Sequence, residues 1–121
     1  MSYEVRTEAK SDHLCVVISG AIGPGMAAPL ADEVIHSYRR EPLPLLLVDL
    51  RGLAVQVEPA EALQLVESYP EVAKGLRVKT AVVCADKNAD AVRFYEMITQ
   101  NRGYPTEVFT DVELALSWLR G

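Results

Sequence analysis

The residues of this chain best suited to chemistry are charged side chains that follow apolar runs. They are the acids Asp49, Glu58, Asp86 and Asp111, accompanied by Arg51 and Lys87. If the apolar runs are parallel strands, their carboxyl ends meet at one edge of a sheet, where open α/β proteins bind ligands. Convergent carboxylates at such an edge could hold Mg²⁺. We favour solvated strand-end acids instead, because no acid pair follows an early parallel strand and the run TEVF ends without a lysine.

Two further features could support catalysis or cofactor binding. The loop GAIGPG at residues 20–25 has neither the GxGxxG spacing of a dinucleotide loop nor the Lys-Ser/Thr of a Walker loop. We interpret it as a flexible start of a helix. Ser19 has no GxSxG surroundings, and its only candidate bases are His13 and His36. We therefore predict a non-enzymatic protein with no cofactor and no metal, and hydrolase or phosphotransfer chemistry on the strand-end acids is the alternative.

Composition narrows the class of protein. The 121 residues are 50% hydrophobic and 24% charged, which is typical of a globular chain, and we expect one domain over residues 1–121. The net charge of −5 and the scattered basic residues argue against nucleic acid as a partner. No apolar run is long enough to span a membrane, and the charged N-terminus is not a signal peptide. Cys15 and Cys84 lie inside apolar runs, so we expect buried thiols and a cytoplasmic protein.

The apolar run at residues 44–50, PLLLVDL, is expected to be the central strand. Near-unbroken apolar residues are typical of a strand that is covered on both faces, and burying each of them contributes roughly 2 kcal/mol. Alternation at residues 3–9 predicts a one-sided strand that forms an antiparallel hairpin with residues 13–20. Residues 77–84 and 106–109 complete the strands. Helical patterns occupy residues 27–40, 59–69 and 89–101 and the C-terminus, which gives the order β-β-α-β-α-β-α-β-α and a mixed sheet.

Local signals predict several boundaries. Residues 52–57 are expected to form a loop before a helix with Pro59 at its first position. Asn88 is placed to cap the next helix, and Gly75 to stop a turn. Thr110 and a glutamate three residues later resemble a capping box for the last helix. The inward face of that helix is expected to consist of Leu114, Ala115, Trp118 and Leu119.

Three stretches carry a resemblance to a known family. They are the central strand and turn LLLVDLRGL, the strand KTAVVCAD, and the tail FYEMITQNRGYPTEVFTDVELALSWL. With the order of elements, they make nearly the whole chain similar to SpoIIAA-like proteins, relatives of the STAS domain (sulfate transporter and anti-sigma-factor antagonist). The chain is especially similar to small stand-alone bacterial STAS/SEC14-like proteins. This resemblance implies an α/β SpoIIAA-like fold, with a mixed sheet of five strands and about four helices.

The resemblance also implies a regulatory module that acts through protein contacts, with a homodimer as the expected assembly. Anti-sigma antagonists of this superfamily carry a phosphorylatable serine in a pattern like D-L-S-x-x-x-x-x-D-S. Counted from Asp49, the serine position falls on Glu58, which has no hydroxyl. Its fixed charge would either contact a partner or only interact favourably with a helix N-terminus. We predict a partner or ligand surface made of Asp49, Arg51, Glu58 and Asp86.

A second function class follows from the same resemblance. CRAL-TRIO lipid-transfer domains share the general topology and hold an apolar ligand between sheet and helices. A carrier of a small apolar or lipid-like ligand is therefore the alternative function. A sizeable cavity is costly in a chain of this length, and aromatic residues at helical spacing usually fill a core. The residues that could line such a cavity are Tyr69, Phe94, Tyr95 and Trp118.

Overall fold

The predicted central strand lies in the middle of a five-stranded sheet, whose order is β1-β2-β3-β4-β5. The strands are β1 (Tyr3–Ala9), β2 (His13–Ile22), β3 (Leu45–Val55), β4 (Lys79–Cys84) and β5 (Thr106–Phe109). β1 pairs antiparallel with β2, and the other neighbours pair parallel. The computed structural model describes residues 1–74 and 76–121. The sequence prediction for Gly75 lies outside these described residues.

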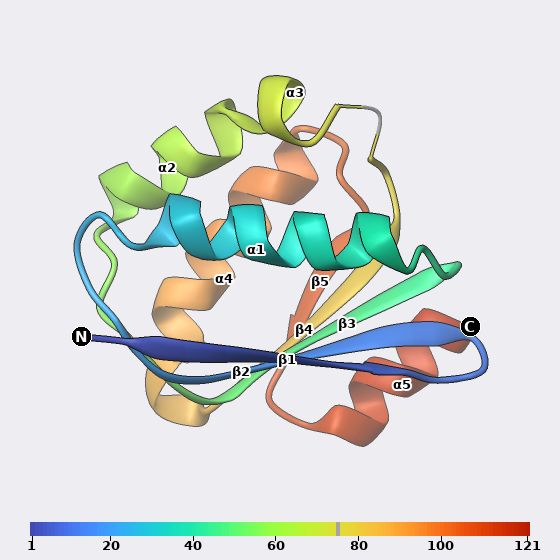
Figure 1. The fold of residues 1–121 in the computed structure, drawn as a ribbon. Helices are drawn as coiled ribbons and strands as arrows, with labels where there is room; N and C mark the ends of the chain where they lie inside the picture. The colour runs from blue at the N-terminus through green and yellow to red at the C-terminus, as the bar shows by residue number, and fades with distance from the viewer. Residues whose placement is uncertain (75) are drawn as a thin grey trace.

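Helices cover both faces of the sheet, as Figure 1 shows. α1 (Ala27–Arg40), α2 (Pro59–Glu67), α3 (Tyr69–Val72) and α4 (Ala89–Asn101) lie over one face, and α5 (Val112–Arg120) lies over the other. A short 3-10 turn, η1 (Asp86–Asn88), precedes α4. No helix in the described ranges is long and apolar enough to cross a bilayer. The mixed α/β architecture predicted from the sequence is confirmed.

The single direction of strand order explains why the helices are divided so unevenly. Crossovers between parallel strands are right-handed, so connections that advance in the same direction place their helices on the same face. The connections from β2 to β3, β3 to β4 and β4 to β5 all advance in this way. α5 follows the last strand and returns beneath the sheet, where it buries Ala115 and Leu119 against β3 and β4.

β3 is longer than the sequence predicts, and residues 52–55 belong to the strand rather than to a loop. The register between β2 and β3 shifts, so that Val17 pairs with Asp49 but Ser19 pairs with Gly52. The extra residue in β3 is a bulge, which exchanges the two faces of the strand. After it, Leu53 and Val55 lie on the same side as Val48. Because the bulge interrupts the alternation of inward and outward side chains, the sequence pattern did not predict this part of the strand.

Three side chains differ from their predicted roles at helix ends. The α5 N-cap is Asp111 rather than Thr110: its Oδ1 accepts from the backbone N–H groups of Glu113 at 2.7 Å and Leu114 at 3.3 Å. Leu114, which the sequence places on the inward face of this helix, is 61% exposed. Asn88 precedes α4 as predicted, but its side chain makes no cap bond and reaches β3 instead. Both Asp111 and Asn88 are good caps in general, and tertiary contacts decide which of them acts as one.

Candidate functional site

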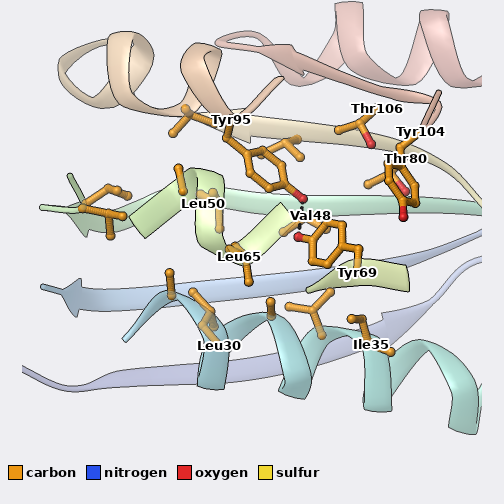
Figure 2. A pocket seen from close by; sticks show the side chains of 18 of the residues that line it. Leu30, Ile35, Val48, Leu50, Leu65, Tyr69, Thr80, Tyr95, Tyr104 and Thr106 are labelled. Atoms are coloured by element: carbon orange, nitrogen blue, oxygen red, sulfur yellow. Dashed lines mark hydrogen bonds between the residues drawn. The ribbon is translucent and has the colours of Figure 1, made fainter. Parts of the chain in front are cut away.

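An apolar cavity lies between the sheet and the helices α1, α2 and α4. Its volume is about 520 Å³, and its wall is mainly apolar. Figure 2 shows Val48 and Leu50 on the sheet side, with Leu30 and Ile35 on α1 and Leu65 on α2 turned toward the space between them. Small-molecule sites in proteins commonly occupy roughly 300–1,000 Å³. The cavity is therefore large enough for a ligand.

Small inward-facing side chains leave this space open. α1 buries an apolar stripe against the sheet, and the apolar stripes of α2 and α4 pack against each other, as the helical spacing predicts. On these stripes, however, several positions carry only a methyl group, which leaves space between the helices and the sheet. These positions are Ala27, Ala31, Ala62 and Ala91 on the helices, with Ala73 just after α3. The alanines are visible in the sequence, but an inward-facing alanine alone does not distinguish a cavity from close packing.

Three of the four aromatic residues that the sequence suggests for a cavity wall line it, namely Tyr69, Phe94 and Tyr95. Trp118 does not. It lies on the α5 face of the sheet, where its ring packs against Phe109 with centroids 5.9 Å apart and the Lys79 ammonium lies 4.6 Å from its ring centre. As the sequence predicts, the other three aromatics belong to a hydrophobic core cluster, with Tyr69 buried and Phe94 and Tyr95 packed against it. Their rings also form part of the cavity wall.

A pair of tyrosine hydroxyls is the main polar feature of the interior. The Tyr69 and Tyr95 hydroxyl oxygens are hydrogen-bonded at 2.7 Å, as the dashed line in Figure 2 shows. Their rings meet edge to face with centroids 6.4 Å apart, and Tyr69 makes a similar contact with Tyr104 at 5.6 Å. Burial raises the pKa of both Tyr69 and Tyr95 above the usual value, so each is a neutral hydroxyl at physiological pH.

The residues predicted from the sequence lie at the carboxyl edge of the strands, outside this cavity. Asp49 is buried on the α5 side of β3. The Arg51 guanidinium donates two hydrogen bonds to its carboxylate, from Nε at 3.0 Å and from a terminal nitrogen at 2.8 Å. The backbone N–H of Arg51 also donates to Asp49 at 3.0 Å. The hydrogen bond from the Arg51 guanidinium lowers the pKa of the Asp49 carboxyl, despite its burial. Asp49 is thus a fixed carboxylate whose oxygens are occupied.

Glu58 and Asp86 are exposed and do not join this ion pair within the described ranges. Glu58 is the N-cap residue of α2, as the sequence predicts, and its backbone oxygen accepts from Glu61 at 3.0 Å and Ala62 at 3.2 Å. Its side chain makes no cap bond. Asp86 begins η1, after β4. The structure therefore brings together Asp49 and Arg51, and leaves Glu58 and Asp86 as separate exposed charges.

Glu61 was not singled out by the sequence, yet it joins two of the cavity-forming helices. Its carboxylate accepts from the backbone N–H of Gly25 at 2.9 and 3.1 Å and from that of Ala27 at 3.2 Å. Gly25 has a φ of +81°, a conformation that favours glycine, and this turns its N–H toward α2. The glycine loop at residues 20–25 therefore binds an anion, but the anion is a carboxylate of the chain itself.

Comparison with known proteins supports the fold. No family model matches the chain, and no curated protein is similar to it in sequence. The crystal structure of an anti-sigma factor antagonist from Mycobacterium paratuberculosis superposes with a TM-score of 0.68 at 18% identity, covering 99% of this chain and 96% of that one. An uncharacterized DUF3478 protein with a SpoIIAA-like fold from Shewanella loihica PV-4 gives 0.56 at 16% identity, covering 97% and 93%. The chain has a SpoIIAA-like fold.

Proposed function

We propose that this protein is a non-enzymatic binding module that holds an apolar molecule between its sheet and its helices α1, α2 and α4. The observation that carries the proposal is the cavity of about 520 Å³ with its mainly apolar wall. An apolar cavity of about 150 Å³ is already enough to bind benzene. The space in this protein is more than three times larger, which suits a fused ring system or an alkyl chain. The polar contacts that a catalytic reaction would need are few in such a wall.

The energetic argument favours an occupied cavity. Cavities created inside protein cores cost about 24 cal/mol per Å³, so 520 Å³ corresponds to roughly 12 kcal/mol as an upper bound, since the cavity is partly open to water. Total stabilities of small proteins are about 5–15 kcal/mol. A sequence under selection for stability alone could reduce this cost by replacing the inward alanines with larger apolar residues. A ligand recovers the lost contacts without that change.

A matched pair of substitutions on α2 tests the proposal. Ala62 lines the cavity, whereas Ala60 is exposed on the same helix. We expect Ala62→Phe to fill part of the cavity, to raise the unfolding temperature and to weaken binding of the neutral apolar fluorophore N-phenyl-1-naphthylamine by about tenfold or more. Ala60→Phe carries the same ring outside the cavity and should leave binding unchanged. Ala91→Phe, which fills the cavity from α4, repeats the test if the first variant is overpacked.

Equal fluorophore binding by wild type and by folded Ala62→Phe and Ala91→Phe would refute the proposal. Native mass spectrometry of the gently purified protein gives a second measurement. An occupied cavity predicts a mass excess of a few hundred daltons that is absent from Ala62→Phe and present in Ala60→Phe.

A second candidate function is contact with a protein partner, in the cytoplasm and as a homodimer. It is favoured by the exposed charge of Glu58 at the N-terminus of α2, and by a fold shared along nearly the whole chain with an anti-sigma factor antagonist. The surface would comprise Glu58, Asp86 and the Asp49–Arg51 ion pair. Sedimentation of wild type and Glu58→Lys tests it. A dimer that Glu58→Lys dissociates supports this surface, and a wild-type monomer at high concentration excludes the homodimer.

A further inference from the structure

The cavity has two ends that differ in charge. Most of its lining residues are buried or half-buried, but Arg77, Pro59 and Asp90 are exposed and therefore lie where the cavity opens. Arg77 lies two residues before β4, and Asp90 lies in the first turn of α4, after β4. β4 has 6 residues, so about 20 Å of strand separates the two positions. The exposed part of the lining thus carries a cation before β4 and a carboxylate after it.

The cation is held on an aromatic surface that leads into the cavity. The Arg77 guanidinium carbon lies 4.3 Å from the centre of the Tyr104 ring, and Tyr104 packs against Tyr69. Within residues 1–74 and 76–121, no carboxylate forms an ion pair with Arg77. A second hollow of about 220 Å³, lined by Arg77, Tyr104 and Tyr69 among others, adjoins the cavity at this end. The guanidinium can therefore meet an anion that enters from solvent.

The tyrosine pair adds a hydrogen-bond donor near the same end. Two hydroxyls that bond to each other use only one of their two protons in that bond. Whichever hydroxyl accepts, its own proton has no acceptor among the described residues. Tyr69 and Tyr95 both line the cavity, so this donor is available to a ligand inside it. Arg77 and the tyrosine pair together supply one positive charge and one neutral donor.

We propose that the ligand is a long-chain carboxylate, bound with its head toward Arg77 and its chain in the apolar cavity beside β4. This inference rests on the proposed function and adds the chemical class and direction of the ligand. A guanidinium matches a carboxylate with two parallel hydrogen bonds, and its flat face is already oriented by the Tyr104 ring. The opposite orientation would place the carboxylate head near Asp90, where like charges repel. The mainly apolar wall between Arg77 and Asp90 accommodates the chain.

Competition against N-phenyl-1-naphthylamine at low ionic strength tests the inference. Three competitors share a twelve-carbon chain and differ in head: dodecanoate, dodecanol and dodecyltrimethylammonium. We expect dodecanoate to compete about tenfold better than dodecanol, and the ammonium compound to compete worst. Arg77→Gln should abolish the advantage of dodecanoate, and Arg77→Lys should retain part of it. The advantage should also shrink as salt is added, because Arg77 is exposed.

Arg40→Gln is the control for net charge. Arg40 ends α1, and the connection after it leads into β3, so Arg40 lies at the same edge of the sheet as Arg77 but does not line the cavity. Arg40→Gln should leave the competition by all three compounds unchanged. Equal competition by dodecanoate and dodecanol in wild type, or an equal loss of all three in Arg77→Gln, would overturn the inference while leaving the proposed function intact. Failure of the fluorophore itself to bind wild type would instead overturn the proposed function.

Discussion

Replacing Asn88 by alanine should destabilise the protein far more than the loss of a helix cap would. The Asn88 side chain is buried, donates to the carbonyl oxygen of Leu53 at 2.8 Å and accepts from the backbone N–H of Val55 at 3.3 Å. In a pair of parallel strands, a residue bonds to the carbonyl oxygen of the residue before its opposite neighbour and to the N–H of the residue after it. The Leu53 oxygen and the Val55 N–H are two such groups. β4 ends opposite Leu50. The Asn88 amide therefore continues the hydrogen bonding along β3 beyond the point where β4 ends.

The magnitude follows from the two backbone groups that would lose their partner. Each hydrogen bond contributes about 1 kcal/mol net, and a buried group left unsatisfied costs about 1–3 kcal/mol. Asn88→Ala should thus lower the free energy of unfolding by about 2–4 kcal/mol. For a chain of this length, that corresponds to a decrease in unfolding temperature of roughly 8–16 °C. Asn88→Asp should be at least as damaging, because a carboxylate cannot donate to Leu53.

Urea unfolding followed by circular dichroism measures the effect. Asn101→Ala is the matched control, because Asn101 is the exposed last residue of α4. We expect that control to lie within about 0.5 kcal/mol of wild type, as is usual for surface substitutions. A similarly small loss for Asn88→Ala would show that the amide does not continue the hydrogen bonding along β3. Leu53 and Val55 also line the cavity, so fluorophore binding by Asn88→Ala should weaken together with stability.

Two further perturbations test contacts that hold elements together. The hydrogen bond from Arg120, followed by that from His13, lowers the pKa of Asp12 to about 2 from 3.8. The stability contributed by Asp12 is therefore present above pH 4 and is lost as the pH falls toward 2. Urea midpoints of wild type between pH 5 and pH 2 should fall more steeply than those of Asp12→Asn, and parallel curves would contradict this role. Glu61→Ala should cost about 1–2 kcal/mol, because the N–H groups that its carboxylate binds lose their partner. Glu67→Ala, an exposed glutamate on the same helix, is the control in the same urea assay, and an equal loss in both variants would argue against a specific link to α1.

Secondary structure was predictable where one local signal dominates. Alternation predicted β1 over residues 3–9, and Pro59 predicted the start of α2. α4 follows Asn88 and spans residues 89–101, as predicted, and Gly103, with φ +81°, comes shortly after it. The extended half of β3 was not predictable, because its bulge depends on pairing with β2 and its last residues are held partly by a side chain from another connection. Such contacts have no periodic trace in the sequence.

The candidate site was only partly predictable, and the reason is the alanine side chain. The sequence indicated that Tyr69, Phe94 and Tyr95 face inward, and they do. An inward-facing alanine, however, is compatible with two outcomes: a helix that packs closely on the sheet, or one that leaves a gap. Ala115 on α5 shows the first outcome and is fully buried, whereas Ala62 on α2 shows the second. Only the distance between helix and sheet separates these cases, and that distance is set by the larger residues around the alanine.

The order of the strands explains why the hollow is beneath the helices rather than at the strand ends. In doubly wound sheets, the strand order reverses and opens a crevice at the carboxyl edge. The order β1-β2-β3-β4-β5 contains no reversal, so neighbouring connections leave the sheet on the same side. The connecting helices must then share one face, where α2 packs against α4 and α1. A layer of helices that is partly supported by its own contacts can stand away from the sheet, as the cavity in Figure 2 shows. α5 has no such neighbour and packs directly on β3 and β4, which is why the opposite face has a filled core.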